Sequence, residues 1–392
     1  MNVNMSKRER RTTHSAWRHW LVACMSVAVA ALVLGGCQGD VVLVDDGDVM
    51  GEGGNTTRAI GFDNTFIARA ASTRAAAPVA LSDYTSSMGV WGWRSDDTTT
   101  DQPQFLDQLV AYDPAANKWQ YNPLRYWERQ STYRFYAYAP HQSDAPAAVT
   151  IDPATGHISV AGVTLAGTNL QMPPTTSQQY VFPVAASGSD IDWMVARAGR
   201  TNVAGRLGQT VEFTMQHILS KLNVAVRIRD ALAADAGVTG VTVESLTIGT
   251  FHAEGDFAQV LDHTPDADVA SDRATVEWAL TDATPALTLH AASNVVVKGE
   301  TNPTNTLLYI LESLVLPQAV TDSQTVKLCY TLTFSDGRTE RYTYMMPFSD
   351  AFGSTTAAGG QLLSGYSYTL RFTIAPDVIT FDPSVNDWIY DY

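Results

Sequence analysis

Hydrophobic and polar residues alternate with a period of two over many short segments of the chain. The clearest segment runs from Val326 to Phe334, with an apolar side chain at every second position, and the pair Asp336-Gly337 follows it. Such alternation is typical of a half-buried β-strand, and Asp-Gly between two such segments is typical of a β-hairpin. The segment from Val241 to Phe251 is also predicted to be a strand, with a bulge near Ser245.

Strands are predicted along most of the chain, whereas a helical period is almost absent. A hairpin is expected between Leu109 and Tyr121, because Asp113-Pro114 supplies a turn in its middle. Opposite the apolar positions of 222–228 stand Asn223, Ala225, Arg227 and Arg229, which predicts that one face of this strand is solvated. Other segments with the same period lie at 132–138, 211–215 and 366–374.

Many short strands separated by frequent turns predict an all-β fold of two tandem sandwich domains. The polar, glycine-rich stretch 200–209 marks the expected boundary between them. This gives an N-terminal sandwich over 75–205 and a C-terminal sandwich over 206–392. Removing the first 36 of 392 residues leaves 356, which is enough chain for two hydrophobic cores.

The N-terminal region has the organisation of a secretory signal. Five basic residues lie between Lys7 and Arg18, and a mostly apolar run follows from Trp20 to Leu34. This run is too short to span a membrane comfortably. The sequence Leu34-Gly35-Gly36-Cys37 that ends it resembles a bacterial lipobox, in which the cysteine is lipidated and becomes the first mature residue. We therefore predict a lipoprotein signal peptide at 1–36; the alternative is an ordinary signal cut after Gly36, with Cys37 incidental.

The mature chain is strongly acidic and poor in cysteine. The whole chain has 25 basic and 40 acidic residues, and the leader holds five and one of them, which leaves 20 − 39 = −19. A protein with this charge is not expected to bind nucleic acid or anionic headgroups, so membrane attachment would come from the lipid on Cys37. Only Cys329 remains besides Cys37, so no intrachain disulfide is expected.

No pattern of catalytic or metal-binding residues stands out. The histidines of the mature chain are scattered, and neither a zinc-binding spacing, a nucleophile elbow nor a phosphate-binding loop occurs. We therefore predict no enzyme, no metal and no cofactor apart from the covalent diacylglycerol and N-acyl lipid on Cys37. The many carboxylates leave an exported hydrolase as a further alternative, although no pair is distinguished.

The tryptophans Trp91, Trp93, Trp119 and Trp127 support two interpretations. Exposed indole rings would stack on sugar faces, which would indicate a glycan-binding surface lipoprotein. Buried rings would form the core of a sandwich, and this interpretation is favoured because the aromatic residues recur at strand spacing.

Several further stretches of the chain form a recognisable series. They are Leu34–Cys37, Thr73–Ala75, Trp119–Pro123 with Tyr126-Trp127, Tyr133–Pro140, Asp192–Ala196, His217–Val224, Leu316–Gln318 and Gly365–Leu370. No single stretch is specific, but together they extend over nearly the whole mature chain. In this order they resemble the fimbrillin family of Bacteroidales, which comprises lipoprotein-derived pilins and their accessory subunits.

The resemblance implies export to the outer membrane as a lipoprotein with two transthyretin-like Greek-key sandwiches. In polymerising members an arginine-specific protease then cuts after an arginine and releases the lipidated segment with its first strand. The best match for the cut is Arg74-Ala75, and Arg69-Ala70 is the second choice. The segment 37–74 would then be a tether with a removable strand at 59–71; an uncut Arg74 would instead indicate an anchor subunit.

The resemblance further implies that a strand from another subunit fills the groove left behind. The C-terminal tail is the candidate donor, with Ile379, Phe381 and Trp388 as the side chains that enter the groove. We therefore expect a structural or adhesive subunit of a cell-surface fimbria at the outer membrane. Its expected partners are other fimbrial subunits, in a homopolymer or a heteropolymer, and a host or bacterial surface receptor.

Overall fold

The computed structural model of the chain describes thirteen ranges within one compact unit, Thr56–Tyr392. The ranges are 59–67, 79–96, 99–128, 131–142, 148–167, 179–180, 190–202, 210–260, 275–281, 286–299, 307–352, 360–375 and 379–387. The predicted signal peptide, 1–36, and the lipidation residue Cys37 lie outside the described residues.

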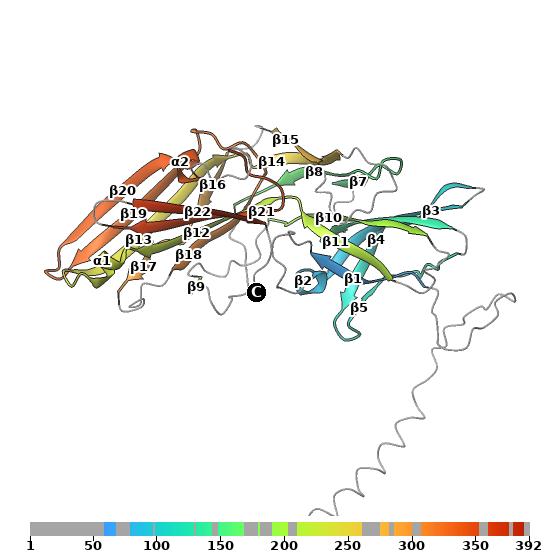
Figure 1. Ribbon diagram of the computed structural model, residues 1–392, viewed down its shortest axis with the longest axis horizontal. Coiled ribbons are helices and arrows are strands. Elements are labelled where there is room, and N and C mark those ends of the chain that lie inside the picture. Colours follow the sequence, from blue (N-terminus) through green and yellow to red (C-terminus); the bar gives the residue numbers. More distant parts are fainter. Residues whose placement is uncertain are drawn as a thin grey trace, which may run out of the picture. The chain divides into compact units, whose positions relative to one another are not determined.

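The largest sheet has eight strands in the order β2-β1-β11-β10-β6-β3-β4-β5 (Figure 1). Its strands are β1 (Gly61–Ile67), β2 (Val79–Ala80), β3 (Ser87–Asp96), β4 (Thr99–Asp113), β5 (Lys118–Gln120), β6 (Thr132–Ala139), β10 (Met194–Asn202) and β11 (Thr210–His217). A short 3-10 helix, η1 (Leu81–Asp83), directly follows β2. All of these strands lie between Gly61 and His217.

A five-stranded sheet has the order β22-β21-β12-β18-β9. Its strands are β9 (Gln179–Tyr180), β12 (Ser220–Ile228), β18 (Leu308–Val315), β21 (Tyr366–Ile374) and β22 (Ile379–Asp387). A second five-stranded sheet has the order β16-β13-β19-β20, with β17 also paired to β13. Its strands are β13 (Val238–Phe251), β16 (Leu287–His290), β17 (Val295–Lys298), β19 (Thr325–Phe334) and β20 (Thr339–Pro347).

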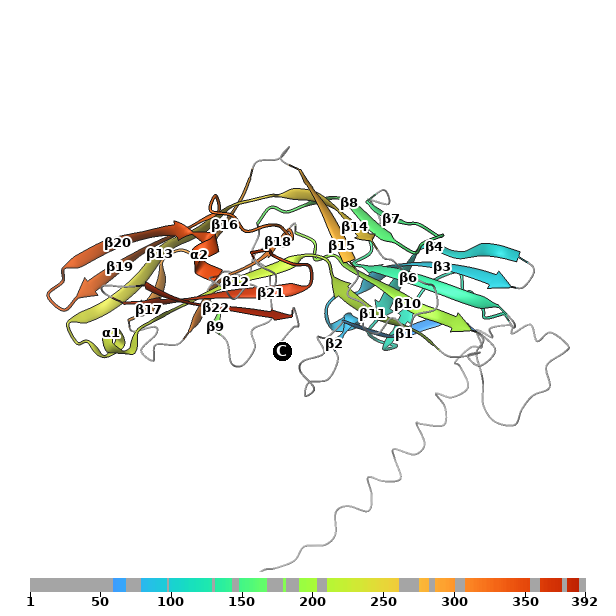
Figure 2. The same ribbon diagram turned by 45° about the horizontal axis from the view of Figure 1, so that its top comes forward.

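The fourth sheet, β15-β14-β8-β7, combines strands from both halves of the chain. Its strands are β7 (Val149–Ile151), β8 (Ile158–Thr164), β14 (Glu254–Val260) and β15 (Thr275–Thr281). Figures 1 and 2 show β8 and β14 side by side, in agreement with their antiparallel register. The described α-helices are the single-turn segments α1 (Asp230–Ala234) and α2 (Phe348–Phe352).

This architecture confirms the predicted all-β class. The alternating segment 326–334 lies within β19, and the predicted hairpin leads from it into β20 with Gly337 in the left-handed region at φ +82°. The register of β13 against β19 shifts between Val243 and Ser245, so the predicted bulge is present. The hairpin expected around Asp113-Pro114 is formed by β4 and β5.

The division at residues 205 and 206 stays a prediction, although hydrogen-bonded pairing crosses it. Strand β11 pairs with β10 and β1, and β14 pairs with β8. Strand β11 leads directly into β12 of the five-stranded sheet through only two residues, Ile218 and Leu219, which are both buried. The chain therefore passes between two sheets with no long linker at this point.

Gly89 on β3 provides a test of the packing in the largest sheet. A Cβ atom there would clash with the ring of the fully buried Tyr138 and lie 2.8 Å from Asp107 Oδ1. We expect Gly89→Ala to destabilise the protein by about 1–3 kcal/mol, because overpacking displaces a ring that has no free space. Urea unfolding measures the change. The control is Gly237→Ala, where a Cβ would meet only the exposed Asp235 side chain; equal losses in both variants would contradict the clash.

Candidate assembly site: the groove filled by β1

Strand β1 is hydrogen-bonded to the protein on both of its sides. On one side it pairs in parallel with β11, with Thr65 opposite Phe213. On the other side β2 pairs in antiparallel orientation with its C-terminal end, with Phe66 opposite Ala80. The segment after β5 approaches its N-terminal end: the Ile60 N–H donates to the Arg125 carbonyl at 2.9 Å, and the Tyr121 hydroxyl donates to the Ile60 carbonyl at 2.7 Å. The eight-stranded sheet therefore curls until the segment after its last strand, β5, reaches the start of β1.

Phe62 is the centre of this arrangement. Its side chain is fully buried, and four aromatic rings surround it. In this cluster, Phe62 included, the centroids of neighbouring rings are 5.3–5.9 Å apart. These rings belong to Phe105, Tyr121, Phe135 and Phe213. The Phe213 ring stacks on Phe62 and the other three meet it edge-on, which are the favoured geometries for aromatic pairs.

The remaining inward positions of β1 are also buried. Ile60 and Ile67 are 1% and 3% exposed, and Thr65, at 2%, donates its hydroxyl to the Phe62 carbonyl at 3.0 Å. The exposed Asp63 accepts the Trp119 N–H through Oδ1 at 3.3 Å. A register shift between Gly61 and Asn64 explains why the buried positions change from 60 and 62 to 65 and 67.

Burial also changes the acidity of Tyr121. Enclosure of its ring raises the pKa of the hydroxyl to about 12, although the Arg125 N–H, which donates to the Tyr121 oxygen at 3.2 Å, opposes this shift. The neutral phenol can then donate to the Ile60 carbonyl at all physiological pH values. This hydroxyl is one of the polar groups that fix the entry of β1 into the sheet.

Loss of β1 would leave a groove of defined chemistry. Its walls would be the unpaired backbone groups of β11 on one side and those of β2 and Arg125 on the other, and its floor would be the aromatic cluster around the place of Phe62. Unpaired strand edges and an apolar floor are features that bind a further extended strand. The arrangement is therefore suited to strand addition.

Most predicted site residues lie outside the described residues. This applies to Cys37, Arg69, Arg74, Ala75 and Trp388, whose roles stay predictions. The other two donor candidates, Ile379 and Phe381, lie in β22, whose backbone pairs with β21 of the same chain at Ile374 and Phe372. Their role in a second subunit likewise stays a prediction.

The four tryptophans belong to the core. Trp91, Trp93, Trp119 and Trp127 are each 4–7% exposed. Trp91 packs against Tyr138 at a centroid distance of 5.1 Å, and Trp127 meets Tyr133 edge-on at 4.9 Å. This confirms the core interpretation and removes the feature that motivated a glycan-binding surface.

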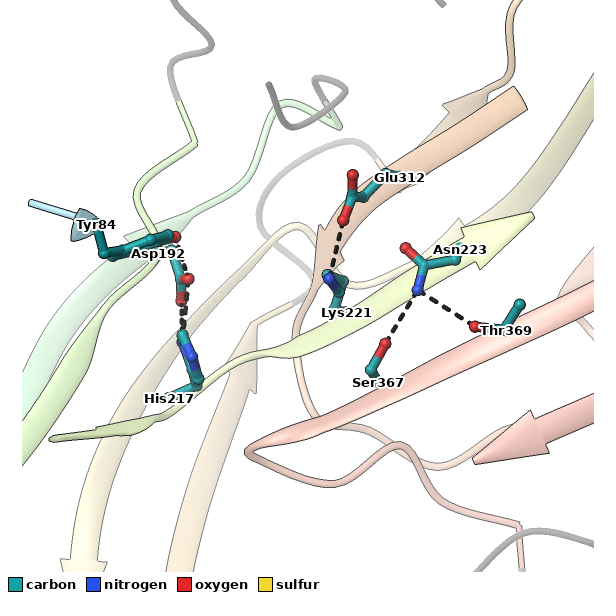
Figure 3. A network of polar contacts seen from close by, with 8 residues as sticks. All are labelled: Tyr84, Asp192, His217, Lys221, Asn223, Glu312, Ser367 and Thr369. Atoms are coloured by element: carbon teal, nitrogen blue, oxygen red, sulfur yellow. Dashed lines mark hydrogen bonds and ion pairs between the residues drawn. The ribbon is translucent and has the colours of Figure 1, made fainter. Parts of the chain in front are cut away.

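A buried polar network follows the passage from β11 to β12 (Figure 3). At the end of β11, His217 Nδ1 lies 3.0 Å from Asp192 Oδ1, and the Tyr84 hydroxyl donates to the same carboxylate. At the start of β12, Lys221 Nζ contacts Glu312 Oε1 on β18 at 2.9 Å.

Two residues further along β12, the Asn223 amide donates to Ser367 at 3.0 Å and to Thr369 at 3.3 Å, both on β21 (Figure 3). Asn223 and Ala225 are buried, whereas Arg227 and Arg229 are exposed, so the predicted solvated face is wrong at its first two positions and present at its last two. Polar residues from neighbouring strands satisfy this face instead of water. Period-two patterning reports polarity but cannot show which polar residue finds a partner.

Among the described residues, no group of three or more histidine, cysteine or acidic side chains is arranged to hold a metal ion. No described helix has the length and apolar character needed to cross a membrane.

A family model described as fimbrillin-like matches residues 73–388, about four-fifths of the chain. The chain belongs to the fimbrillin-like family. No curated protein matches the chain. Among solved structures, a fimbrial protein from Bacteroides vulgatus is similar with a TM-score of 0.55 and 13% identity, over 85% of this chain and 100% of that one. The tip fimbrial protein Mfa3 from Porphyromonas gingivalis, with a C-terminal truncation, is similar with a TM-score of 0.35 and 10% identity, over 77% and 94%.

Membership of the fimbrillin-like family is consistent with the predicted resemblance and with the all-β fold shared with the B. vulgatus protein. The matched region begins at residue 73, whereas β1 ends at Ile67. The family match therefore includes the walls and floor of the groove but not the strand that fills it.

Truncation of Phe62 tests its central place in the core. We expect Phe62→Ala to lower the free energy of unfolding by about 3–5 kcal/mol, because it leaves a cavity between four rings. Phe66→Ala on the same strand is the matched control, since Phe66 is only half-buried. Chemical denaturation of both variants measures the difference, and an equally large loss for Phe66→Ala would contradict the assignment.

The raised pKa of Tyr121 predicts a loss of stability in alkali. An unfolded tyrosine releases its proton near pH 10 and the folded Tyr121 near pH 12, so the unfolded state binds fewer protons between these values and stability falls as the pH rises. This contribution amounts to about 1 kcal/mol per pH unit in that window.

Urea unfolding at about pH 9 and about pH 11 tests this prediction. Tyr121→Phe should show a smaller decrease than the unaltered protein by about 1 kcal/mol. Tyr126→Phe, at an exposed position of the same segment, is the control. The same decrease in all three proteins would show that Tyr121 is not the group responsible.

Proposed function

We propose that the protein is a structural or adhesive, non-catalytic subunit of a cell-surface fimbria that is exported to the outer membrane as a lipoprotein on Cys37. The observation that carries this proposal is the construction of β1 as a plug: all of its inward side chains are buried and both of its sides are hydrogen-bonded. Membership of the fimbrillin-like family supports the fimbrial role.

Proteolysis after Arg74 would release this plug. Both candidate arginines, Arg74 and Arg69, lie between the end of β1 at Ile67 and the start of β2 at Val79. A cut at either position would leave β1 attached to the rest of the protein only by non-covalent contacts. A cut after Arg58, by contrast, would precede β1 and leave it covalently in place.

A strand from another subunit would then occupy the vacated groove. The C-terminal tail is the proposed donor, with Ile379, Phe381 and Trp388 as its candidate anchoring residues. Its partners would be other fimbrial subunits, either identical or different, and a surface receptor bound by the assembled fibre. The lipid on Cys37 would hold the subunit at the membrane until the cut.

Limited digestion with an arginine-specific protease tests this sequence of events. The protein used is residues 38–392, which contains the whole compact unit. We expect one cut after Arg74, read by intact mass, followed by a ladder of oligomers under non-denaturing conditions. Arg74→Ala should abolish the ladder, whereas Arg58→Ala, upstream of β1, should not.

Two results would contradict the proposal of strand exchange. One is resistance of the 67–79 region to the protease. The other is a correctly cut product that loses the β1 segment and remains monomeric.

A further inference from the structure

We infer that residues 379–385 of the tail resemble residues 60–66 in sequence, and that they bind the groove of a second molecule of this chain in the same register as residues 60–66. This inference rests on the proposed strand exchange and specifies its register. The dipeptide Phe-Asp occurs at only two places among the 13 phenylalanines of the chain. These are Ile60-Gly61-Phe62-Asp63-Asn64-Thr65-Phe66 in β1 and Ile379-Thr380-Phe381-Asp382-Pro383-Ser384-Val385 in the tail.

The shared positions are those that the groove contacts most closely. An isoleucine leads both segments, and Ile60 is buried where the chain enters the sheet. Phenylalanine follows at the place of Phe62, inside the aromatic cluster. Aspartate follows at the place of Asp63, which accepts the Trp119 N–H. Ser384 has a hydroxyl group at the place of the buried Thr65, whose own hydroxyl donates to the Phe62 carbonyl.

The positions that differ fall where the groove tolerates a change. At Gly61, which Thr380 would replace, an added Cβ meets the tip of the Thr210 side chain at 3.3 Å, so a small movement of that side chain makes room. Asn64, which Pro383 would replace, lies at the register shift of β1. Bulges are among the few places in a sheet where proline is accepted.

The similarity between the two segments ends at the next inward position. Ile67 is 3% exposed, and the corresponding tail residue is Asn386. The tail is therefore predicted to bind through the seven residues 379–385 and to lack the last apolar contact that β1 makes. Asn386→Ile should restore that contact and strengthen assembly.

The tethering of the tail favours a second copy as the acceptor. Ile374, the last residue of β21, pairs with Ile228 at the end of β12 that is remote from β11. The nine residues of β12 span about 30 Å, whereas the four residues 375–378 that precede Ile379 allow a reach of only about 17 Å. The motif at 379–384 therefore cannot easily reach a groove bordered by the β11 of its own chain.

Engineered disulfides at outward-facing positions test the register without disturbing the core. Phe66 pairs with Thr214 on β11, so the inference places Val385 of the donor opposite Thr214 of the acceptor. Two preparations of residues 38–392, one carrying Val385→Cys and the other Thr214→Cys, are mixed, cut with the arginine-specific protease and mildly oxidised. Glu212→Cys replaces Thr214→Cys in the matched control, because Glu212 is exposed on the same face two residues away.

The expected result is an intermolecular disulfide between positions 385 and 214 and little or none between 385 and 212. Oligomers that form with neither disulfide, or with only the 385–212 disulfide, would overturn the register while leaving strand exchange intact. A cut protein that releases β1 and stays monomeric would overturn strand exchange itself, and the register with it.

Alanine substitution of single side chains in the tail gives an independent test. Phe381→Ala should weaken assembly of the cut protein by about 100-fold or more, as expected for removal of a ring from an aromatic pocket. Met345→Ala, at an exposed position of β20 outside the tail and the groove, should leave assembly nearly unchanged. Equal effects of the two substitutions would contradict the inference.

Discussion

The packing of Phe62 among four aromatic rings is the contact on which the N-terminal sheet depends. The ring lies on a strand that is bonded on both sides, because β11 pairs with one side and β2 together with Arg125 bonds to the other. Without an occupant at this place, the sheet would have an open seam and an exposed aromatic floor. The short strand β1 therefore both completes the hydrophobic core and covers the strands on either side of it.

This dependence is consistent with a strand that is replaced and never simply lost. Unpaired backbone groups and exposed rings would make an empty groove aggregation-prone, so a subunit must keep β1 until a substitute is available. Arg69, the second-choice cut site, and β1 itself lie outside the family match, whereas Arg74 lies just inside its first residues. The match therefore includes the groove but not the strand that fills it.

Local patterns in the sequence predicted much of the fold but not its closure. Alternation and turn residues identified the β19–β20 hairpin and the bulge near Ser245, because both depend on neighbours in the chain. The pairing of β1 with β11 joins residues about 150 positions apart, and no local period reports such a register. For the same reason, burial of Lys221 and Asn223 was missed, since their partners Glu312 and Ser367 come from distant strands.

The pairing of β22 in its own chain shows what the tail would lose and gain by strand exchange. In its own chain, β22 lies at the edge of a sheet and pairs with β21, and its exposed Asp382 forms an ion-pair contact with Arg371 at 3.8 Å. In the groove, the same backbone would bond on two sides, as β1 does, and Phe381 would enter the cluster that holds Phe62. A tail that moves from the edge to the groove would give up its ladder with β21 and would gain pairing on two sides together with a place for Phe381 in the aromatic cluster.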